Sequence, residues 1–215
     1  ASDGIGATEA FVRLAERAGL ALLVPDDVDA LCCGTPWASK GMAEGHAVMG
    51  ERVRASLLRA TDGGRLPVVV DASSCAHGVA DLAETAGIEV LDAVTYIARE
   101  ALGELEVSEK LPSVTLHPTC SSAHMGTVGD LRAVAEAAAD QVQIPVNWAC
   151  CGYAGDRGML HPELTESATR AEAKTVAELD SRYHASSNRT CELGMTQATG
   201  EPYAHVLELL ERATR

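Results

Sequence analysis

The tripeptide Cys-Cys-Gly occurs twice in this 215-residue chain, first as Cys32–Gly34 and again as Cys150–Gly152. Each copy is followed about forty residues later by a single cysteine, Cys75 in the first case and Cys191 in the second. Cys120, upstream of the second pair, completes the seven cysteines of the chain. Adjacent cysteines do not bridge each other without strain, but they can present two thiolates to one metal centre. The pattern therefore indicates metal chemistry before disulfide chemistry.

The charge and hydropathy of the chain exclude several classes of partner. The formal net charge is −14 and the pI is about 4.8, with no cluster of Lys and Arg. A nucleic-acid binder needs such a basic stripe to displace counterions. No apolar run approaches the roughly 20 residues that span a bilayer. We expect neither nucleic-acid binding nor a transmembrane segment.

Cysteine usage also indicates a compartment. An odd number of cysteines with two vicinal pairs fits a reducing environment better than a secreted disulfide framework, and no charged-then-apolar leader opens the sequence. The sequence predicts a cytoplasmic location, either free or peripheral on the inner face of a membrane.

Helical and strand patterns alternate along the chain. In the first half we expect helices at 8–18, 42–60 and 78–86, and strands at 20–24, 66–70 and 88–91. In the second half we expect strands at 113–116, 142–146 and 183–185, and helices at 129–139 and 165–179. This alternation predicts an α/β fold with mostly parallel sheets and cysteines at the carboxyl ends of strands. We interpret it as two pseudo-repeated, Rossmann-like modules, at residues 1–105 and 106–215.

The first repeat lacks one cysteine of the second. Superimposing the two Cys-Cys-Gly motifs places the counterpart of Cys120 at Ser2, at Ala1 or just upstream. The helix at 8–18 also lacks the preceding strand that its counterpart has. The repeat predicts that the chain begins inside a module and that the natural protein extends further upstream.

Each cysteine set suits a soft metal centre. The second set (Cys120, Cys150, Cys151 and Cys191) offers four thiolates, enough for a 4Fe–4S or 2Fe–2S cluster or a zinc ion. Its ligands come from three separate loops, which favours a cluster over zinc; buried inert thiols are a third reading. The first set (Cys32, Cys33 and Cys75) is one ligand short and would hold a second cluster only in a longer protein.

Several neighbours of the cysteines have candidate roles. Gly34, Gly152 and Gly155 would let the backbone approach a cluster and donate N–H groups. Arg157 would either balance cluster charge or brace its loop through a salt bridge. His117 is more often a hydrogen-bonded structural histidine than a ligand or proton carrier. No residue is predicted to be catalytic.

The sequence resembles the cysteine-rich CCG domain. The resemblance rests on five segments that span nearly the whole chain: CCGTPWASKG (32–41), VVVDASSC (68–75), HPTCSSAHMG (117–126), CCGYAGDRGMLHPELTESATR (150–170) and SSNRTCELGMTQATGEPY (186–203). Such domains occur in a subunit of heterodisulfide reductase, in the iron–sulfur subunit of glycolate oxidase and in the C-terminal region of FAD-linked D-lactate dehydrogenases. The segments are most similar to the last group.

The resemblance implies the electron-carrying region of a larger flavoprotein that oxidises D-lactate or a related 2-hydroxy acid. Its partners would be FAD-binding and ferredoxin-like domains upstream or in the same complex, and a cytochrome or quinone acceptor. This chain contains neither an FAD-binding region nor a ferredoxin cysteine run, so the resemblance implies a fragment inactive alone. The alternatives are a thiol–disulfide or heterodisulfide reductase-type subunit, which the absence of a fifth cysteine per module disfavours, and a zinc-binding structural domain.

Overall fold

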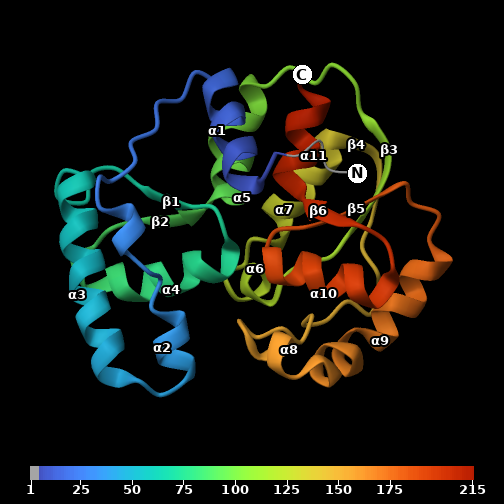
Figure 1. The fold of residues 1–215 in the computed structure, drawn as a ribbon. Helices are drawn as coiled ribbons and strands as arrows, with labels where there is room; N and C mark the ends of the chain where they lie inside the picture. The colour runs from blue at the N-terminus through green and yellow to red at the C-terminus, as the bar shows by residue number, and fades with distance from the viewer. Residues whose placement is uncertain (1–4) are drawn as a thin grey trace.

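The computed structural model describes residues 5–215 and confirms an α/β fold with parallel sheets (Figure 1). Ser2 and Ala1, where the repeat places the missing cysteine, lie outside the described residues. One sheet pairs β1 (Val68–Val70) with β2 (Val90–Asp92). The other has the order β4-β3-β5-β6, formed by β3 (Leu111–Leu116), β4 (Ala139–Gln143), β5 (Tyr183–Ser186) and β6 (Tyr203–His205). Every pairing is parallel.

Helices connect these strands. They are α1 (Ala7–Arg17), α2 (Thr35–Ser39), α3 (Ala43–Ala60), α4 (Ser73–Ala83), α5 (Ala93–Tyr96), α6 (Cys120–His124), α7 (Val128–Ala138), α8 (Arg157–Leu160), α9 (Pro162–Glu178), α10 (Arg189–Thr199) and α11 (Val206–Ala213). Short 3-10 turns cover Val28–Ala30, Glu84–Ala86 and Leu102–Glu104, and a π-turn covers Ile97–Ala101. None of the helices in residues 5–215 combines the length and the apolar character that crossing a bilayer needs.

The main hydrophobic core joins the two ends of the chain. On α1, Ala10, Phe11 and Leu14 are spaced to share one face, and all three are buried. They belong to the same core cluster as Val114 of β3 and Leu210 of α11. A helix of the first half therefore packs on the second half, and the core is continuous across residue 105.

Strand order determines where the cysteines gather. In the four-stranded sheet the chain leaves β3 for β4 on one side and then continues to β5 and β6 on the other. The strand order thus reverses between β3 and β5, and open α/β sheets place their sites beyond the carboxyl ends of strands at such a point. Cys120 follows β3, the pair at Cys150 follows β4, and Cys191 follows β5.

Two expected strands differ in the structure. The segment 20–24 forms no strand, and Leu23 and Val24 are 66% and 68% exposed. A strand needs a hydrogen-bonding neighbour, and β1 pairs with β2 alone among the described residues. The strand expected at 142–146 is instead β4, which starts three residues earlier and ends at Gln143. Pro145 cannot donate to a sheet ladder, and Val146 beyond it is 96% exposed.

Several helices were misplaced or missed by the sequence patterns. The helix expected at 78–86 begins at Ser73 as α4, so Cys75 lies in its first turn rather than in a loop. Cys191 likewise lies in the first turn of α10, which was not expected, and Cys120 opens α6. The elements α5, β6 and α11 were also not expected. The helix α11 was missed although Val206, Leu209, Leu210 and Ala213 follow helical spacing, whereas α5 and β6, at 4 and 3 residues, are too short for periodicity to separate them from loops.

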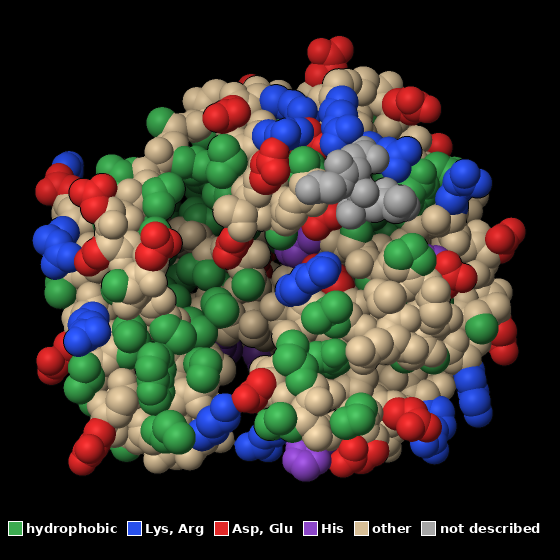
Figure 2. All heavy atoms as spheres, in the orientation of Figure 1, with side chains coloured by type: hydrophobic (Ala, Val, Ile, Leu, Met, Phe, Trp, Pro, Cys, Tyr) green, Lys and Arg blue, Asp and Glu red, His purple; other side chains and the backbone are tan. Residues whose placement is uncertain are grey.

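A space-filling view shows a hollow between a left lobe, which carries α2 to α4, and a right lobe, which carries α8 to α10 (Figure 2). Lys40 and Arg157 each make one polar contact between these lobes. Lys40 Nζ lies 2.7 Å from Asp156 Oδ2, and Arg157 donates to the Ser39 carbonyl oxygen at 3.5 Å. Both contacts are exposed, so each stabilises the fold only slightly.

Candidate metal centre

The four thiols of the second set lie in contact with one another. The sulfurs of Cys151 and Cys191 are 3.1 Å apart. The Cys150 side chain interacts with both Cys120 and Cys151. Cys151 and Cys191 are each 3% exposed, whereas Cys120 and Cys150 are open to solvent. The sheet thus brings together the four side chains that the sequence pattern selected.

The first set forms a smaller cluster in the other half. Cys33 interacts with both Cys75 and Cys32, and all three are partly exposed. Gly78 of α4 allows this approach, because a Cβ there would lie 2.6 Å from the Cys33 carbonyl oxygen and closer still to Thr35 Oγ1. Only a residue without a side chain fits at that position.

Thiols that share hydrogen bonds have shifted pKa values. A hydrogen bond from Cys75 lowers the pKa of Cys33 to about 5 and raises that of Cys75. In the second set, the hydrogen bond from Cys151 and the nearby imidazole of His117 lower the pKa of Cys191 to about 6. The Cys120 thiol lowers the pKa of Cys150 in the same way. In each set the shared hydrogen bonds therefore favour the thiolate form, which binds metals, at one cysteine at the expense of its neighbour.

A buried histidine and a buried glutamate support the second set. His117 Nδ1 lies 2.8 Å from Glu172 Oε1, and the two side chains are 0% and 2% exposed. Burial alone would lower the pKa of His117, but the neighbouring Cys191 thiol and Glu172 carboxylate raise it to about 9. His117 is thus hydrogen-bonded, as the sequence predicted. Glu172 was not singled out, because one glutamate on a helix carries no spacing signal.

The other predicted residues lie at different distances from the sulfurs. The Gly152 amide donates to Cys150 Sγ at 3.4 Å, and its φ of +76° suits glycine. Gly34 directly follows the first pair and precedes α2. Gly155 and Arg157 are exposed, and the contact of Arg157 is the one to Ser39 across the two lobes. The structure therefore places one of the four, Gly152, in hydrogen-bond contact with a sulfur.

The second set has the soft sulfur donors that either a metal ion or an iron–sulfur cluster needs. Among residues 5–215, no three His, Cys, Asp or Glu side chains are arranged around a point that one metal ion would occupy. The Cys151–Cys191 separation of 3.1 Å is shorter than the roughly 3.8 Å between thiolates on a tetrahedral zinc ion, so these two sulfurs would have to move apart to hold either a metal ion or a cluster. The donor chemistry nevertheless suits a cluster, because four sulfurs converge from three loops. His117 Nε2, buried and without a hydrogen bond of good geometry, offers a donor for added sulfur charge.

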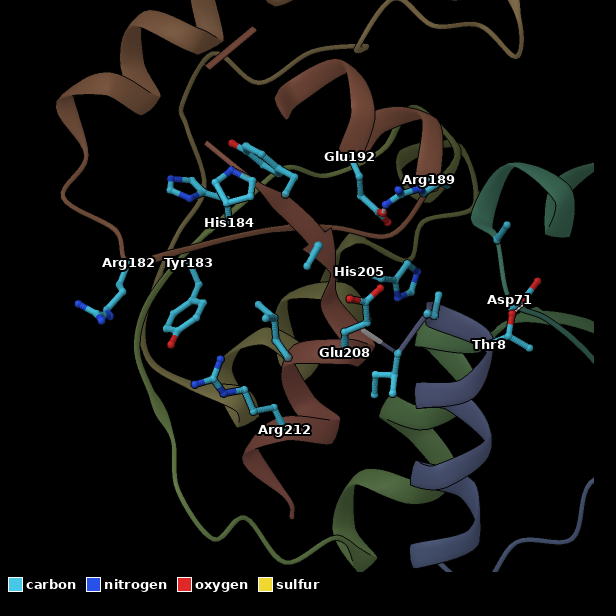
Figure 3. Close-up of a pocket in the computed structure, with 18 of the residues that line it drawn as sticks. Thr8, Asp71, Arg182, Tyr183, His184, Arg189, Glu192, His205, Glu208 and Arg212 are labelled. Atoms are coloured by element: carbon cyan, nitrogen blue, oxygen red, sulfur yellow. Dashed lines mark hydrogen bonds and ion pairs between the residues drawn. The ribbon is translucent and has the colours of Figure 1, made fainter. Parts of the chain in front are cut away.

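A separate cavity lies away from the cysteines. A hollow of about 510 Å³ runs beside β5 and β6 and the start of α1, and no cysteine lines it (Figure 3). Glu192, Glu208 and His205 gather along it, with Arg189 beside Glu192. The unpaired atoms of its two most buried residues, Glu192 Oε1 and His205 Nε2, are enclosed by protein. The cavity is therefore separate from the thiol chemistry.

The fold and the thiols together define an α/β protein with a cysteine centre at the carboxyl edge of a parallel sheet. Residues 114–196 match the family model of the cysteine-rich domain CCG, which identifies this part of the chain as a CCG domain. The match includes every cysteine of the second set and none of the first. No curated protein matches the chain.

Proposed function

We propose that the second set holds an iron–sulfur cluster of the 4Fe–4S type, and that the chain is the electron-transfer region of a larger oxidoreductase. The contact of four sulfurs from three loops carries this proposal. A cluster of this kind, when bound, accepts and releases single electrons. Cys120, Cys150, Cys151 and Cys191 would hold it, and the two exposed cysteines would place it within reach of a partner.

The protein around the sulfurs would do three things. Tyr153 packs on Cys151 and Cys191 and excludes water from the buried side of the site. The Gly152 amide donates to Cys150 Sγ and would offset thiolate charge. His117 would direct a further N–H group at Cys191.

Partners and location follow from the same proposal. We propose that electrons come from FAD-bearing and ferredoxin-like domains of the same polypeptide or complex, which oxidise D-lactate or a related 2-hydroxy acid. They would then pass to a cytochrome or quinone on the cytoplasmic side of a membrane. The two cysteine sets would mark two modules divided near residue 105, with a second cluster at the first set only where a further ligand is supplied.

Anaerobic reconstitution with Fe²⁺ and sulfide tests the proposal. We expect bound iron, visible absorption and a paramagnetic signal after reduction, all lost in Cys191→Ala. The matched control is Cys75→Ala, which removes a thiol from the first set and should retain the signal. If wild-type protein binds no iron under these conditions, the proposal fails.

One observation favours a second candidate, a thiol–disulfide reductase. The sulfurs of Cys151 and Cys191 lie 3.1 Å apart, close enough to join with little movement. In that reaction two thiols give up two electrons and two protons as their S–S bond forms, and a substrate disulfide is reduced to two thiols. Turnover of a small disulfide by iron-free protein, abolished in Cys151→Ser, would favour this candidate over the cluster.

A further inference from the structure

One buried carboxylate contacts two of the three segments that carry the thiols of the second set. Glu172 lies on α9 and is 2% exposed. Its Oε1 lies 2.8 Å from His117 Nδ1, and its Oε2 accepts a hydrogen bond from the Ala149 amide at 3.3 Å. The two carboxylate oxygens of Glu172 thus contact two different segments of the chain.

These two segments, with a third, are the ones that carry the cysteines. His117 lies three residues before Cys120 at the end of β3, and Ala149 directly precedes Cys150. The imidazole of His117 also interacts with Cys191 at the start of α10. Glu172 therefore connects the loops after β3 and β4 directly, and the loop after β5 through His117.

Two hydrogen bonds with neighbouring strand residues already fix the main chain of His117. The contact with Glu172 therefore determines only the orientation of the His117 ring. The His117 amide donates to the Ala185 carbonyl at 2.8 Å, and Ser186 Oγ donates to the His117 carbonyl at 2.9 Å. With Nδ1 held against a carboxylate, Nε2 is the ring nitrogen left to interact with Cys191. Nε2 is buried and lacks a hydrogen bond of good geometry among the described residues.

An ion pair buried this deeply is an inefficient way to stabilise a fold. Its desolvation penalty can equal or exceed its Coulombic gain, and apolar residues of similar volume often serve stability as well. A positioning role gives the pair a purpose that apolar packing cannot supply, because metal-centre ligands are commonly oriented by hydrogen-bonded partners behind them.

We propose that Glu172 is a positioning residue of the cysteine centre, which aims His117 Nε2–H at Cys191 Sγ and anchors the amide before Cys150. This inference rests on the proposed cluster for its functional consequence. The contacts themselves are present without it.

Glu172→Gln tests the inference, because glutamine keeps the volume but offers only one acceptor oxygen for two donors. In the reconstituted protein we expect about 10- to 100-fold weaker iron retention against a chelator. We also expect a more negative midpoint potential, since a donor to sulfur is lost. The matched control is Glu211→Gln, another buried glutamate that pairs with Arg13, Arg17 and Arg215 away from the cysteines. It should lower stability without changing the potential.

A second readout does not depend on iron. In reduced, metal-free protein, nitrogen-15 NMR of the His117 ring should show a protected Nδ1–H in wild type and in Glu211→Gln, and its loss in Glu172→Gln. An unchanged ring signal together with an unchanged potential overturns the inference. Should wild type bind no iron, the proposed function fails while the ring signal still decides the role of Glu172. If Glu172→Gln does not fold, His117→Gln leaves the carboxylate on Ala149 and should shift the potential in the same direction; an unshifted potential there also overturns it.

Discussion

Ser73 Oγ lies 3.1 Å from Thr119 Oγ1, and this contact joins the two halves of the chain beside their cysteines. Ser73 is in the first turn of α4, two residues before Cys75, and Thr119 caps α6 directly before Cys120. Both are buried, and Ser73 also donates to the Ser187 carbonyl at 3.3 Å. The starts of two cysteine-bearing helices are thereby fixed relative to each other.

Ser73→Ala should lower the free energy of unfolding by about 1–3 kcal/mol, because buried partners at Thr119 and Ser187 lose a hydrogen bond. Denaturant unfolding measures this loss. The control is Ser39→Ala, whose hydroxyl contacts the Pro36 carbonyl at the surface. Equal effects from the two substitutions would show that the contact between the halves contributes nothing.

Gly78→Ala should damage the first cysteine set by overpacking. An added methyl group would lie 2.6 Å from the Cys33 carbonyl oxygen, so the backbone must shift, at a cost of about 1–3 kcal/mol. We also expect slower reaction of Cys33 with a thiol reagent, since its hydrogen bond from Cys75 is disturbed. Gly103→Ala is the control, because no atom lies within 4 Å of a Cβ there. Similar unfolding curves for the two variants would contradict this account.

The sequence predicted the cysteine sites better than the elements that carry them. Cysteine spacing selected four residues that do meet, because each follows a strand and parallel strands end at one edge. The strand predicted at 20–24 was wrong, because apolar composition does not show whether a partner strand is present. Glu172 was missed for a related reason: its significance lies in contacts with His117 and Ala149, which are far from it in sequence.

His205 should make the protein sensitive to acid. Burial lowers its pKa to about 4, from an unfolded value near 6.5. A base with a depressed pKa contributes stability that is complete above pH 6.5 and is lost as pH falls toward 4, amounting to about 3 kcal/mol at most. His205→Asn removes the titration and can still accept from the Leu207 amide at the start of α11. Its unfolding free energy should therefore fall less than that of wild type as the pH is lowered through this range.

The comparison for this prediction is His161→Asn, which replaces a histidine whose side chain is 60% exposed. This variant should follow the wild-type pH profile, because it replaces a surface side chain and leaves His205 in place. A His205→Asn profile as steep as that of wild type would assign the acid sensitivity to other groups.

Air should oxidise the second set at one pair first. Cys151 and Cys191 have sulfurs 3.1 Å apart, and a disulfide needs about 2.05 Å, a movement within reach of small side-chain rotations. The low pKa of Cys191, about 6, provides the thiolate that begins the reaction with an oxidised thiol or disulfide reagent. Peptide mapping after mild oxidation should find this pair linked while Cys32 is still free.

Because the disulfide consumes both proposed ligands, Cys151 and Cys191, oxidised protein should take up no iron until a thiol reductant is added. Full iron uptake by protein with this disulfide intact would show that these two sulfurs are not ligands.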